Sequence, residues 1–160
     1  MLHLNNISKS GLFLMVLLCL TVITNCGGKD QAQAPEDMIR DFVAKHHVMV
    51  DESLASYYVT EEQDEVTQLI TRSTEEKKQA GTLSNLKQAS FDYSNLKISV
   101  IAQKEEYIQD EPVDFMKISA NGKLLVKMAN DSKSIDINDE IILEKQGGSW
   151  KVTEKTNPWG

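Results

Sequence analysis

Four tyrosines and one aspartate supply the side chains that acid–base chemistry needs: Tyr57, Tyr58, Asp92, Tyr93 and Tyr107. A carboxylate can take a proton from a substrate, and a tyrosine hydroxyl can stabilise an oxyanion by donating a hydrogen bond. The spacing of these residues does not place an acid and a tyrosine together. We therefore expect the tyrosine hydroxyls at the surface and Asp92 in solvent.

His46 and His47 are the candidate metal ligands. Neighbouring side chains diverge by about 100° on a helix, so this pair cannot chelate one ion as histidines at i and i+4 can. We expect one histidine at the edge of the core and the other in water, with no zinc between them.

Two acidic runs could attract a cation or favour a helix end. Residues 131–140 lack the spacing and the central glycine of a calcium loop, and Ile135 and Ile137 alternate as in a strand. Residues 61–65 fit the first turn of a helix, whose dipole favours acids. We therefore expect solvated or structural roles for the oxygen-bearing residues of both runs: Asp131, Asp136, Asn138, Asp139 and Glu140, and Glu61, Glu62, Asp64 and Glu65.

Both cysteines, Cys19 and Cys26, lie near the start of the chain. The rest of the chain therefore has no disulfide, no cysteine nucleophile and no thiolate zinc site. Residues 1–10 carry His3 and Lys9 but no acid, and residues 11–23 are apolar apart from Thr21. A helix of thirteen residues is about 20 Å long and the hydrocarbon core is about 30 Å thick, which favours a secretory signal over a transmembrane helix.

The residues Ile23-Thr24-Asn25-Cys26 resemble the lipobox of bacterial lipoproteins. The resemblance implies a signal peptide at residues 1–25, cleavage between Asn25 and Cys26, lipidation of Cys26 and a flexible tether at residues 26–34. Gly27 after the cysteine implies the periplasmic face of the outer membrane if the cell has two membranes. The alternative is an ordinary secretory leader with an incidental cysteine.

The charge of the chain limits its partners. Lys9 is the only formal charge in residues 1–25, so cleavage would change the net charge from −7 to −8. Nucleic acid and anionic lipid surfaces would be repelled, and we expect membrane attachment through Cys26 alone. The length of residues 35–160 suits one domain.

Helical patterns fill the first half of this domain. Pro35 opens a helix whose apolar face includes Phe42, and residues 51–58 form a second short helical segment. Thr60 and Gln63 match a capping box for a third helix, which ends before Gly81.

Strand patterns follow. Strands are predicted at residues 89–93, 96–100, 113–120, 123–129 and 134–145, and then from Trp150 onward. The sequence predicts a break at Asn95, a polar connection at residues 110–112, a hairpin at Asn121-Gly122, a polar turn at residues 130–133 and a turn at Gly147-Gly148. We expect Trp150 in the core and Trp159 folded back onto the domain. Helices followed by an antiparallel meander predict an α+β fold.

The opening helix (residues 35–42) and the closing hairpin (residues 141–152, with Trp150) resemble the nuclear-transport-factor-2-like, or cystatin-like, roll. The resemblance implies N-terminal helices packed on a curved antiparallel sheet of four to six strands, as in small exported bacterial domains. This fold hosts many activities, so it implies no function by itself.

We therefore expect a membrane-anchored, non-enzymatic envelope lipoprotein that binds a small ligand or a protein partner and needs no cofactor or metal. One alternative is a cavity enzyme of the ketosteroid-isomerase-like roll, which would use an acid and a tyrosine. Another is a protein-interaction or inhibitor module, for which exposed apolar surface near Tyr107 or Trp159 would be the sign.

Overall fold

The computed structural model describes residues 34–160. The predicted signal peptide, Asn25, Cys26 and most of the predicted tether lie outside these residues. Among the helices of the described part, none has the length and apolar character needed to cross a membrane.

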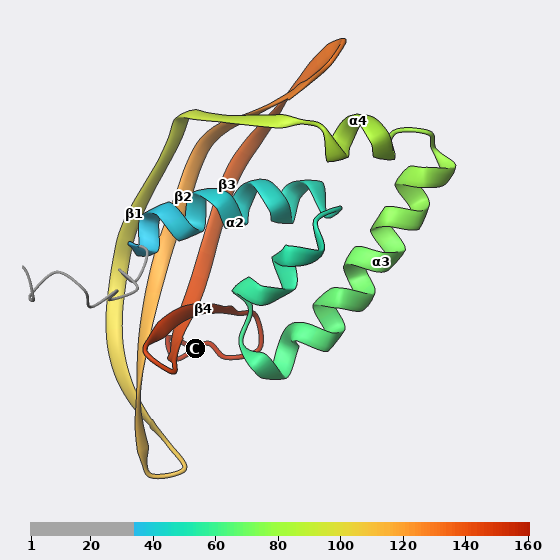
Figure 1. The fold of residues 1–160 in the computed structure, drawn as a ribbon. Helices are drawn as coiled ribbons and strands as arrows, with labels where there is room; N and C mark the ends of the chain where they lie inside the picture. Colours follow the sequence, from blue (N-terminus) through green and yellow to red (C-terminus); the bar gives the residue numbers. More distant parts are fainter. Residues whose placement is uncertain (1–33) are drawn as a thin grey trace, which may run out of the picture. The chain divides into compact units, whose positions relative to one another are not determined.

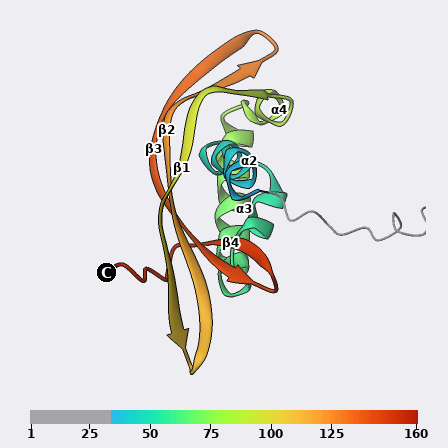
Figure 2. The ribbon, with the colours of Figure 1, turned by 90° about the vertical axis from the view of Figure 1, so that its left-hand side faces the viewer.

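Helices come first in the described chain and strands follow, as the sequence predicts. The helical half consists of α2 (Pro35–Val48), the 3-10 helices η2 (Glu52–Tyr57) and η3 (Thr60–Glu62), α3 (Gln63–Gln79) and α4 (Leu83–Lys87). An antiparallel sheet follows in the order β1-β2-β3-β4, made of β1 (Ser90–Ile108), β2 (Glu111–Met128), β3 (Asp131–Gln146) and β4 (Ser149–Thr153). The sheet is curved and the helices lie on one side of it (Figure 1, Figure 2). The fold class is therefore α+β.

The local sequence determines both ends of α2. Pro35 lies in the first turn, where its missing N–H costs no hydrogen bond, and Glu36 and Asp37 complement the positive end of the helix dipole. At the other end, Met49 adopts a left-handed conformation and its N–H donates to the carbonyl of Lys45 at 2.7 Å. This ending turns the chain from α2 toward η2.

The core lies between α2 and the concave face of the sheet (Figure 1). Its buried side chains include Ile39, Phe42 and Val43 from α2, Leu54 and Tyr58 from the η2 segment, Ile70 from α3, and Leu96, Ile118, Leu124, Ile137 and Leu143 from the sheet. Gln33–Gly160 is a compact unit by its own contacts. Since this unit contains the whole core of the described residues, we expect it to fold without the leader.

The predicted hairpin at Asn121-Gly122 is wrong, because β2 runs straight through both residues. Gly122 pairs with Leu96 of β1 and with Ile137 of β3, and its φ is 129°. A Cβ here would lie 2.0 Å from the carbonyl oxygen of Asn95. The glycine therefore permits a close approach of two strands beside an irregularity in β1, and it makes no turn.

The turns of the sheet also differ from the prediction. The β1–β2 turn lies at Gln109 and Asp110, with φ of 53° and 67°, and β2 begins directly afterwards at Glu111. The two strands predicted on either side of Asn95 form one strand of 19 residues, β1, whose pairing shifts between Asp92 and Asn95 without breaking. The turn predicted at residues 130–133 is shorter, because β3 begins at Asp131. The turn at Gly147-Gly148 is confirmed.

The predicted capping box is also wrong. Thr60 begins η3, and α3 begins at Gln63 without a side-chain cap. The Gln63 side-chain amide donates to the carbonyl of Tyr58 at 3.0 Å, and the Thr60 N–H donates to Gln146 at 3.2 Å. The helix α4 is not among the predicted elements, because its five residues are too few to show a helical period.

Candidate functional site

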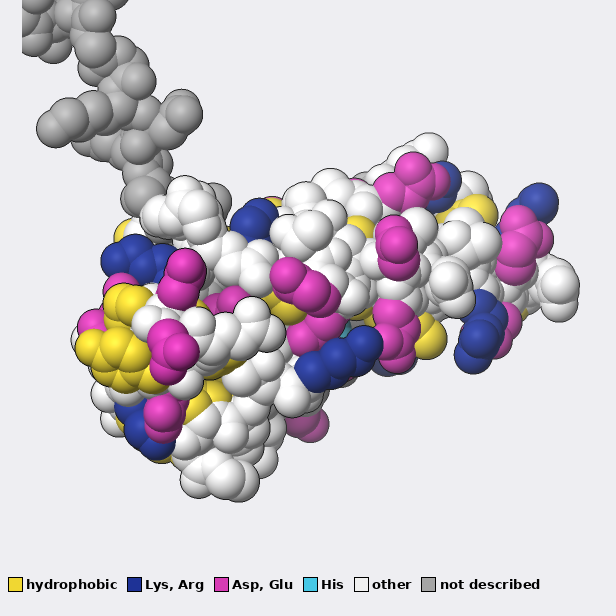
Figure 3. All heavy atoms as spheres, turned by 90° about the horizontal axis from the view of Figure 1, so that it is seen from below, with side chains coloured by type: hydrophobic (Ala, Val, Ile, Leu, Met, Phe, Trp, Pro, Cys, Tyr) yellow, Lys and Arg dark blue, Asp and Glu magenta, His cyan; other side chains and the backbone are white. Residues whose placement is uncertain are grey.

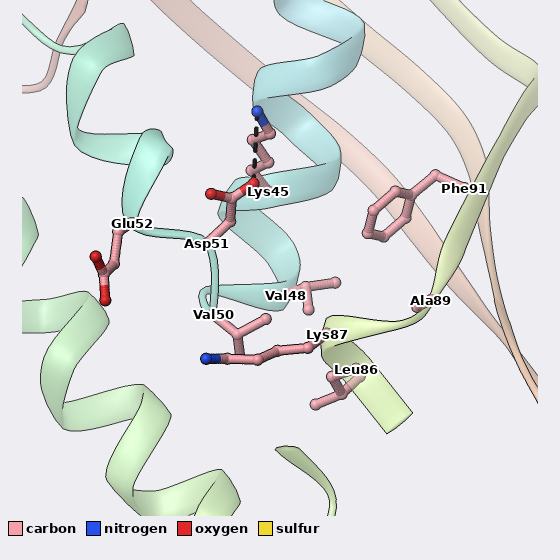
Figure 4. A pocket seen from close by; sticks show the side chains of 9 residues that line it. All are labelled: Lys45, Val48, Val50, Asp51, Glu52, Leu86, Lys87, Ala89 and Phe91. Carbon is pink, nitrogen blue, oxygen red and sulfur yellow. Dashed lines mark ion pairs between the residues drawn. The ribbon is translucent and has the colours of Figure 1, made fainter. Parts of the chain in front are cut away.

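A pocket of about 550 Å³ lies where the end of α2 faces α4 and the start of β1 (Figure 4). Its apolar wall consists of Val48, Val50, Leu86, Ala89 and Phe91, and its charged rim of Lys45, Asp51, Glu52 and Lys87. Apolar walls with a few polar groups, at a volume of roughly 300–1,000 Å³, are typical of small-molecule sites.

Lys45 fixes one side of this pocket. Its Nζ lies 2.9 Å from Asp41 and 3.5 Å from Asp51, and it donates to the hydroxyls of Ser53 at 2.9 Å and Tyr57 at 3.3 Å. Burial alone would lower the pKa of Lys45, but its hydrogen bonds to Asp41 and Tyr57 outweigh burial and raise it. The ammonium is therefore charged and held in place, so it shapes the rim rather than titrating near neutral pH.

Lys87 differs from Lys45. It lines the same pocket from the end of α4, and none of the described residues forms an ion pair with it. Figure 4 shows its side chain extending across the pocket beside Val50. An anionic group on a ligand could therefore pair with Lys87 without breaking an ion pair within the described chain.

A second pocket, of about 490 Å³, lies between α2, β3 and the end of β4, with Phe42, His46, Asp139 and Glu154 among its lining residues. Hydrogen bonds link two of these lining residues, His46 and Glu154, through the buried Tyr58. The Tyr58 hydroxyl donates to Glu154 at 2.9 Å, and His46 Nδ1 lies 3.1 Å from the same hydroxyl. If the Tyr58 proton lies toward Glu154, His46 Nδ1 must be the donor, which leaves Nε2 as an acceptor.

Burial shifts the pKa values of His46 and Tyr58 in this hydrogen-bonded group. Burial and the neighbouring His47 lower the pKa of His46, and the nearby Glu154 and Asp139 only partly oppose this. Burial and the adjacent Glu154 raise the pKa of Tyr58. His46 is therefore neutral at neutral pH, and Tyr58 keeps its proton.

The two histidines point to different partners. His47 Nε2 lies 2.8 Å from Asp139 on β3, whereas His46 contacts Tyr58 and packs against Phe42 with ring centroids 5.2 Å apart. Within residues 34–160, no group of three or more histidine, cysteine or acidic side chains is arranged to hold a metal ion.

The acid–base set taken from the sequence does not come together around Asp92. This carboxylate accepts hydrogen bonds from Lys127 at 2.8 Å and from the Ser94 N–H at 3.0 Å, and the Lys127 ammonium lowers its pKa. Tyr93 packs near Phe91, and burial raises its pKa, whereas Tyr107 is 70% exposed at the end of β1. Within residues 34–160, Tyr58 donates to Glu154 and Tyr57 to Asp41. The expectation that the tyrosine hydroxyls lie at the surface is wrong for Tyr58, which is 1% exposed because it packs in the core.

The acidic run at residues 131–140 is spread along β3. Asp136 pairs with Lys123 at 3.5 Å and Glu140 with Lys117 at 2.6 Å, both across the strand pair β2–β3. Asp139 lies on the other face and contacts His47 instead. Asp131 and Asn138 are exposed. The predicted strand through Ile135 and Ile137 is confirmed.

Glu62 is the residue whose environment the sequence analysis missed. It is only 4% exposed, whereas Glu61, Asp64 and Glu65 around it are exposed. Its carboxylate accepts hydrogen bonds from Thr153 Oγ1 at 2.7 Å and from the N–H groups of Glu154 at 3.0 Å and Lys155 at 3.3 Å. It therefore ties the start of α3 to the end of β4, a contact between residues about ninety positions apart that no local pattern reveals.

The two tryptophans pack against the domain. Trp150 is partly buried against the core, and Lys145 Nζ lies 5.7 Å from the centroid of its ring. Lys104 donates to the carbonyl of Pro158 at 2.8 Å, which ties the C-terminal segment to β1, and the neighbouring Trp159 is partly buried. The segment folds back onto the domain, as expected.

Comparison with known proteins adds no relative: no family model and no curated protein matches this chain.

Proposed function

We propose that this protein is a non-enzymatic envelope lipoprotein whose domain binds a small amphipathic ligand in the pocket between α2 and α4. The observation that carries the proposal is the composition of this pocket, five apolar side chains beside a charged rim. Such a site would bury a short apolar body and leave a polar head at the rim.

The charge of Lys87 at the pocket rim indicates what kind of polar head group the ligand would carry. Lys45 is already surrounded by Asp41, Asp51 and Tyr57, so a ligand gains little from it. Lys87 has no ion-pair partner among residues 34–160. A carboxylate or another anionic head group of a ligand would therefore pair with the Lys87 ammonium. The proposed ligand class is an aliphatic or aromatic acid.

We further propose that the curved sheet and its helices form a cystatin-like roll. The order of elements supports this: helices first, then an antiparallel meander whose concave face α2 covers. The Gly turn followed by Trp150 at the close of the sheet supports it as well.

The anchor is part of the same proposal. The apolar leader and the lipobox-like residues before Cys26 support cleavage after Asn25 and lipidation of Cys26. The chain would then be held at the cell envelope by its acyl groups, on the periplasmic face of the outer membrane in a cell with two membranes.

The cavity enzyme is the weaker alternative. Such an enzyme needs an enclosed site with a carboxylate and a tyrosine, and α2 fills the concave face of the sheet with Ile39, Phe42 and Val43. Of the two pockets described above, neither has a tyrosine among its lining residues. The packing of the sheet therefore supports a binding role over an acid–base one.

Calorimetric titration of Gln33–Gly160 with decanoate tests the binding proposal. Decanoate is expected to bind, and Ala89→Trp, which fills the pocket, should weaken binding at least about 10-fold. Lys87→Gln should weaken binding of decanoate but not of decanol. The control Lys97→Gln should change neither, because Lys97 is an exposed lysine on the opposite face of the sheet from the core residues Leu96 and Ile98. Binding that Ala89→Trp leaves unchanged would contradict this site.

A further inference from the structure

The end of the β1–β2 hairpin carries apolar side chains that no helix covers. Tyr107 is 70% exposed and Ile108 41% exposed, and Figure 1 shows the hairpin extending past the helices and β4. Pro112 pairs across the strands with Tyr107, and Val113 with Glu106. We call these four apolar residues, Tyr107, Ile108, Pro112 and Val113, the hairpin tip.

The two strands of the hairpin tip remain paired up to the turn. Pairing continues to Ile108 and Glu111, the last residues before a two-residue turn at Gln109 and Asp110. Both turn residues have positive φ, the conformation of a tight type I′ turn. A rigid aromatic side chain loses little conformational freedom when a partner covers it, so Tyr107 is well suited to anchor an interface.

Acids outnumber cations around the hairpin tip. Residues 105–114 contain the acids Glu105, Glu106, Asp110, Glu111 and Asp114, and no lysine or arginine. Lys104 pairs with Glu106 at 2.5 Å and Lys145 pairs with Asp114 at 3.1 Å. The other three acids, Glu105, Asp110 and Glu111, have no ion-pair partner among residues 34–160. The tip therefore exposes apolar side chains on both faces of the hairpin, with acids beside them that are only partly neutralised.

Figure 3 views the domain from the hairpin end and shows a hydrophobic patch with acidic side chains beside it. A lipid surface is a poor match, because bacterial bilayers carry anionic head groups, whereas this tip has an excess of acids and its two neighbouring lysines are already paired with acids. A protein surface with an apolar pocket and lysine or arginine around it matches both features.

We propose that the hairpin tip is a docking surface for a protein partner, which receives the end of the hairpin, with Tyr107 on one face and Ile108 on the other, in an apolar pocket bordered by lysine and arginine. The site is separate from the pocket between α2 and α4, since none of the residues lining that pocket belongs to the hairpin tip. An experiment that contradicts one of these two sites would therefore leave the other unaffected.

Selection of random 12-residue peptides displayed on phage, with the full chain in a non-ionic detergent as bait, tests this proposal. The selected peptides are expected to combine lysine or arginine with apolar residues, and raising NaCl from about 0.05 to 0.5 M should weaken their binding at least about 5-fold. Tyr107→Ser and Ile108→Ser should each weaken it at least about 10-fold. The matched control is Leu69→Ser on α3, which removes an apolar side chain of similar exposure, 39%, and should change binding less than about 2-fold.

Three results would overturn the proposal: no peptide enrichment, selected peptides without cationic residues, or binding that is insensitive to Tyr107→Ser. A second measurement addresses lipid. The full chain is placed in nanodiscs of phosphatidylethanolamine and phosphatidylglycerol that contain a nitroxide-labelled lipid. The NMR signals of Tyr107 and Ile108 should remain sharp, and strong broadening would replace the protein partner with a membrane contact.

Discussion

Glu62 shows how one carboxylate can join parts of the chain that are distant in sequence. Three donors from residues 153–155 converge on it, and one of them is the Thr153 hydroxyl, which is itself buried. A buried carboxylate without these donors would be costly, so the three hydrogen bonds are a condition for its burial.

Replacing this carboxylate by an amide should weaken the fold. Glu62→Gln removes the negative charge that strengthens the three hydrogen bonds, and the new amide N–H₂ group faces hydrogen-bond donors instead of acceptors. We therefore expect a loss of about 2 kcal/mol in the free energy of unfolding. Asp64→Asn, in the exposed first turn of the following helix α3, should cost less than about 1 kcal/mol. Urea unfolding measures both, and equal losses in the two variants would contradict the role given to Glu62.

His46 should make stability depend on pH. Since burial and His47 lower its pKa below the ordinary value of 6.5, the unfolded chain binds this proton more tightly than the folded one. Stability should therefore fall as the pH drops below about 6.5, by at most about 1.4 kcal/mol per pH unit for one proton.

The variant His46→Asn isolates this effect from the other groups that face the imidazole, namely His47, Tyr58, Asp139 and Glu154. Asparagine can still donate a hydrogen bond to the Tyr58 hydroxyl but does not titrate. Urea unfolding between pH 5 and pH 8 should give a shallower slope for the variant than for the unchanged chain. Parallel slopes would mean that His46 is not the group responsible.

The elements show how far a sequence pattern reaches. The helical period around Phe42 and the alternation of Ile135 and Ile137 predict α2 and β3, because both patterns follow from one buried face. The prediction of a hairpin at Gly122 is wrong because a glycine with positive φ can serve either a hairpin turn or a close approach of two strands. The sequence around Gly122 does not distinguish these cases, since the close contact is with Asn95 on the neighbouring strand. Gln109 and Asp110 make the actual turn without a glycine, so the local sequence carries only a weak signal for it.

The candidate site was less predictable than the elements. Its wall combines the end of α2, the helix α4 and the start of β1, which lie next to one another only after folding. Val50, Leu86 and Phe91 look like ordinary core residues in the sequence, and Lys87 looks like an ordinary surface lysine. No periodicity distinguishes a lysine at the rim of a pocket from one in open solvent.

Gly122 provides a test at the scale of the sheet. Gly122→Ala must relieve a contact of 2.0 Å with a backbone carbonyl while keeping a φ of 129°, so we expect a loss of at least about 2 kcal/mol in stability. Gly147→Ala has a positive φ of 57° but no atom within 4 Å of the new Cβ, and should cost about 1 kcal/mol. Thermal unfolding of both variants measures the difference, and a Gly122→Ala variant as stable as Gly147→Ala would contradict the close approach.

At the scale of the whole molecule, the proposed anchor depends on one side chain. Cys26→Ala should leave an unprocessed precursor, because both lipidation and cleavage of a lipoprotein need this cysteine. Labelling cells with a radioactive or alkyne-tagged fatty acid, followed by mass spectrometry of the chain, measures both steps. A normally processed, acyl-labelled Cys26→Ala chain would contradict the lipobox interpretation.

The pocket between α2 and α4 is the proposed binding site for an amphipathic acid. The most direct measurement is a ¹H–¹⁵N NMR titration of Gln33–Gly160 with decanoate, which locates the ligand residue by residue. We predict that the perturbed amides cluster at Val48, Val50, Leu86, Ala89 and Phe91, with Lys87 among the most strongly affected. No perturbation at saturating decanoate, or one centred on another surface, would contradict the claim.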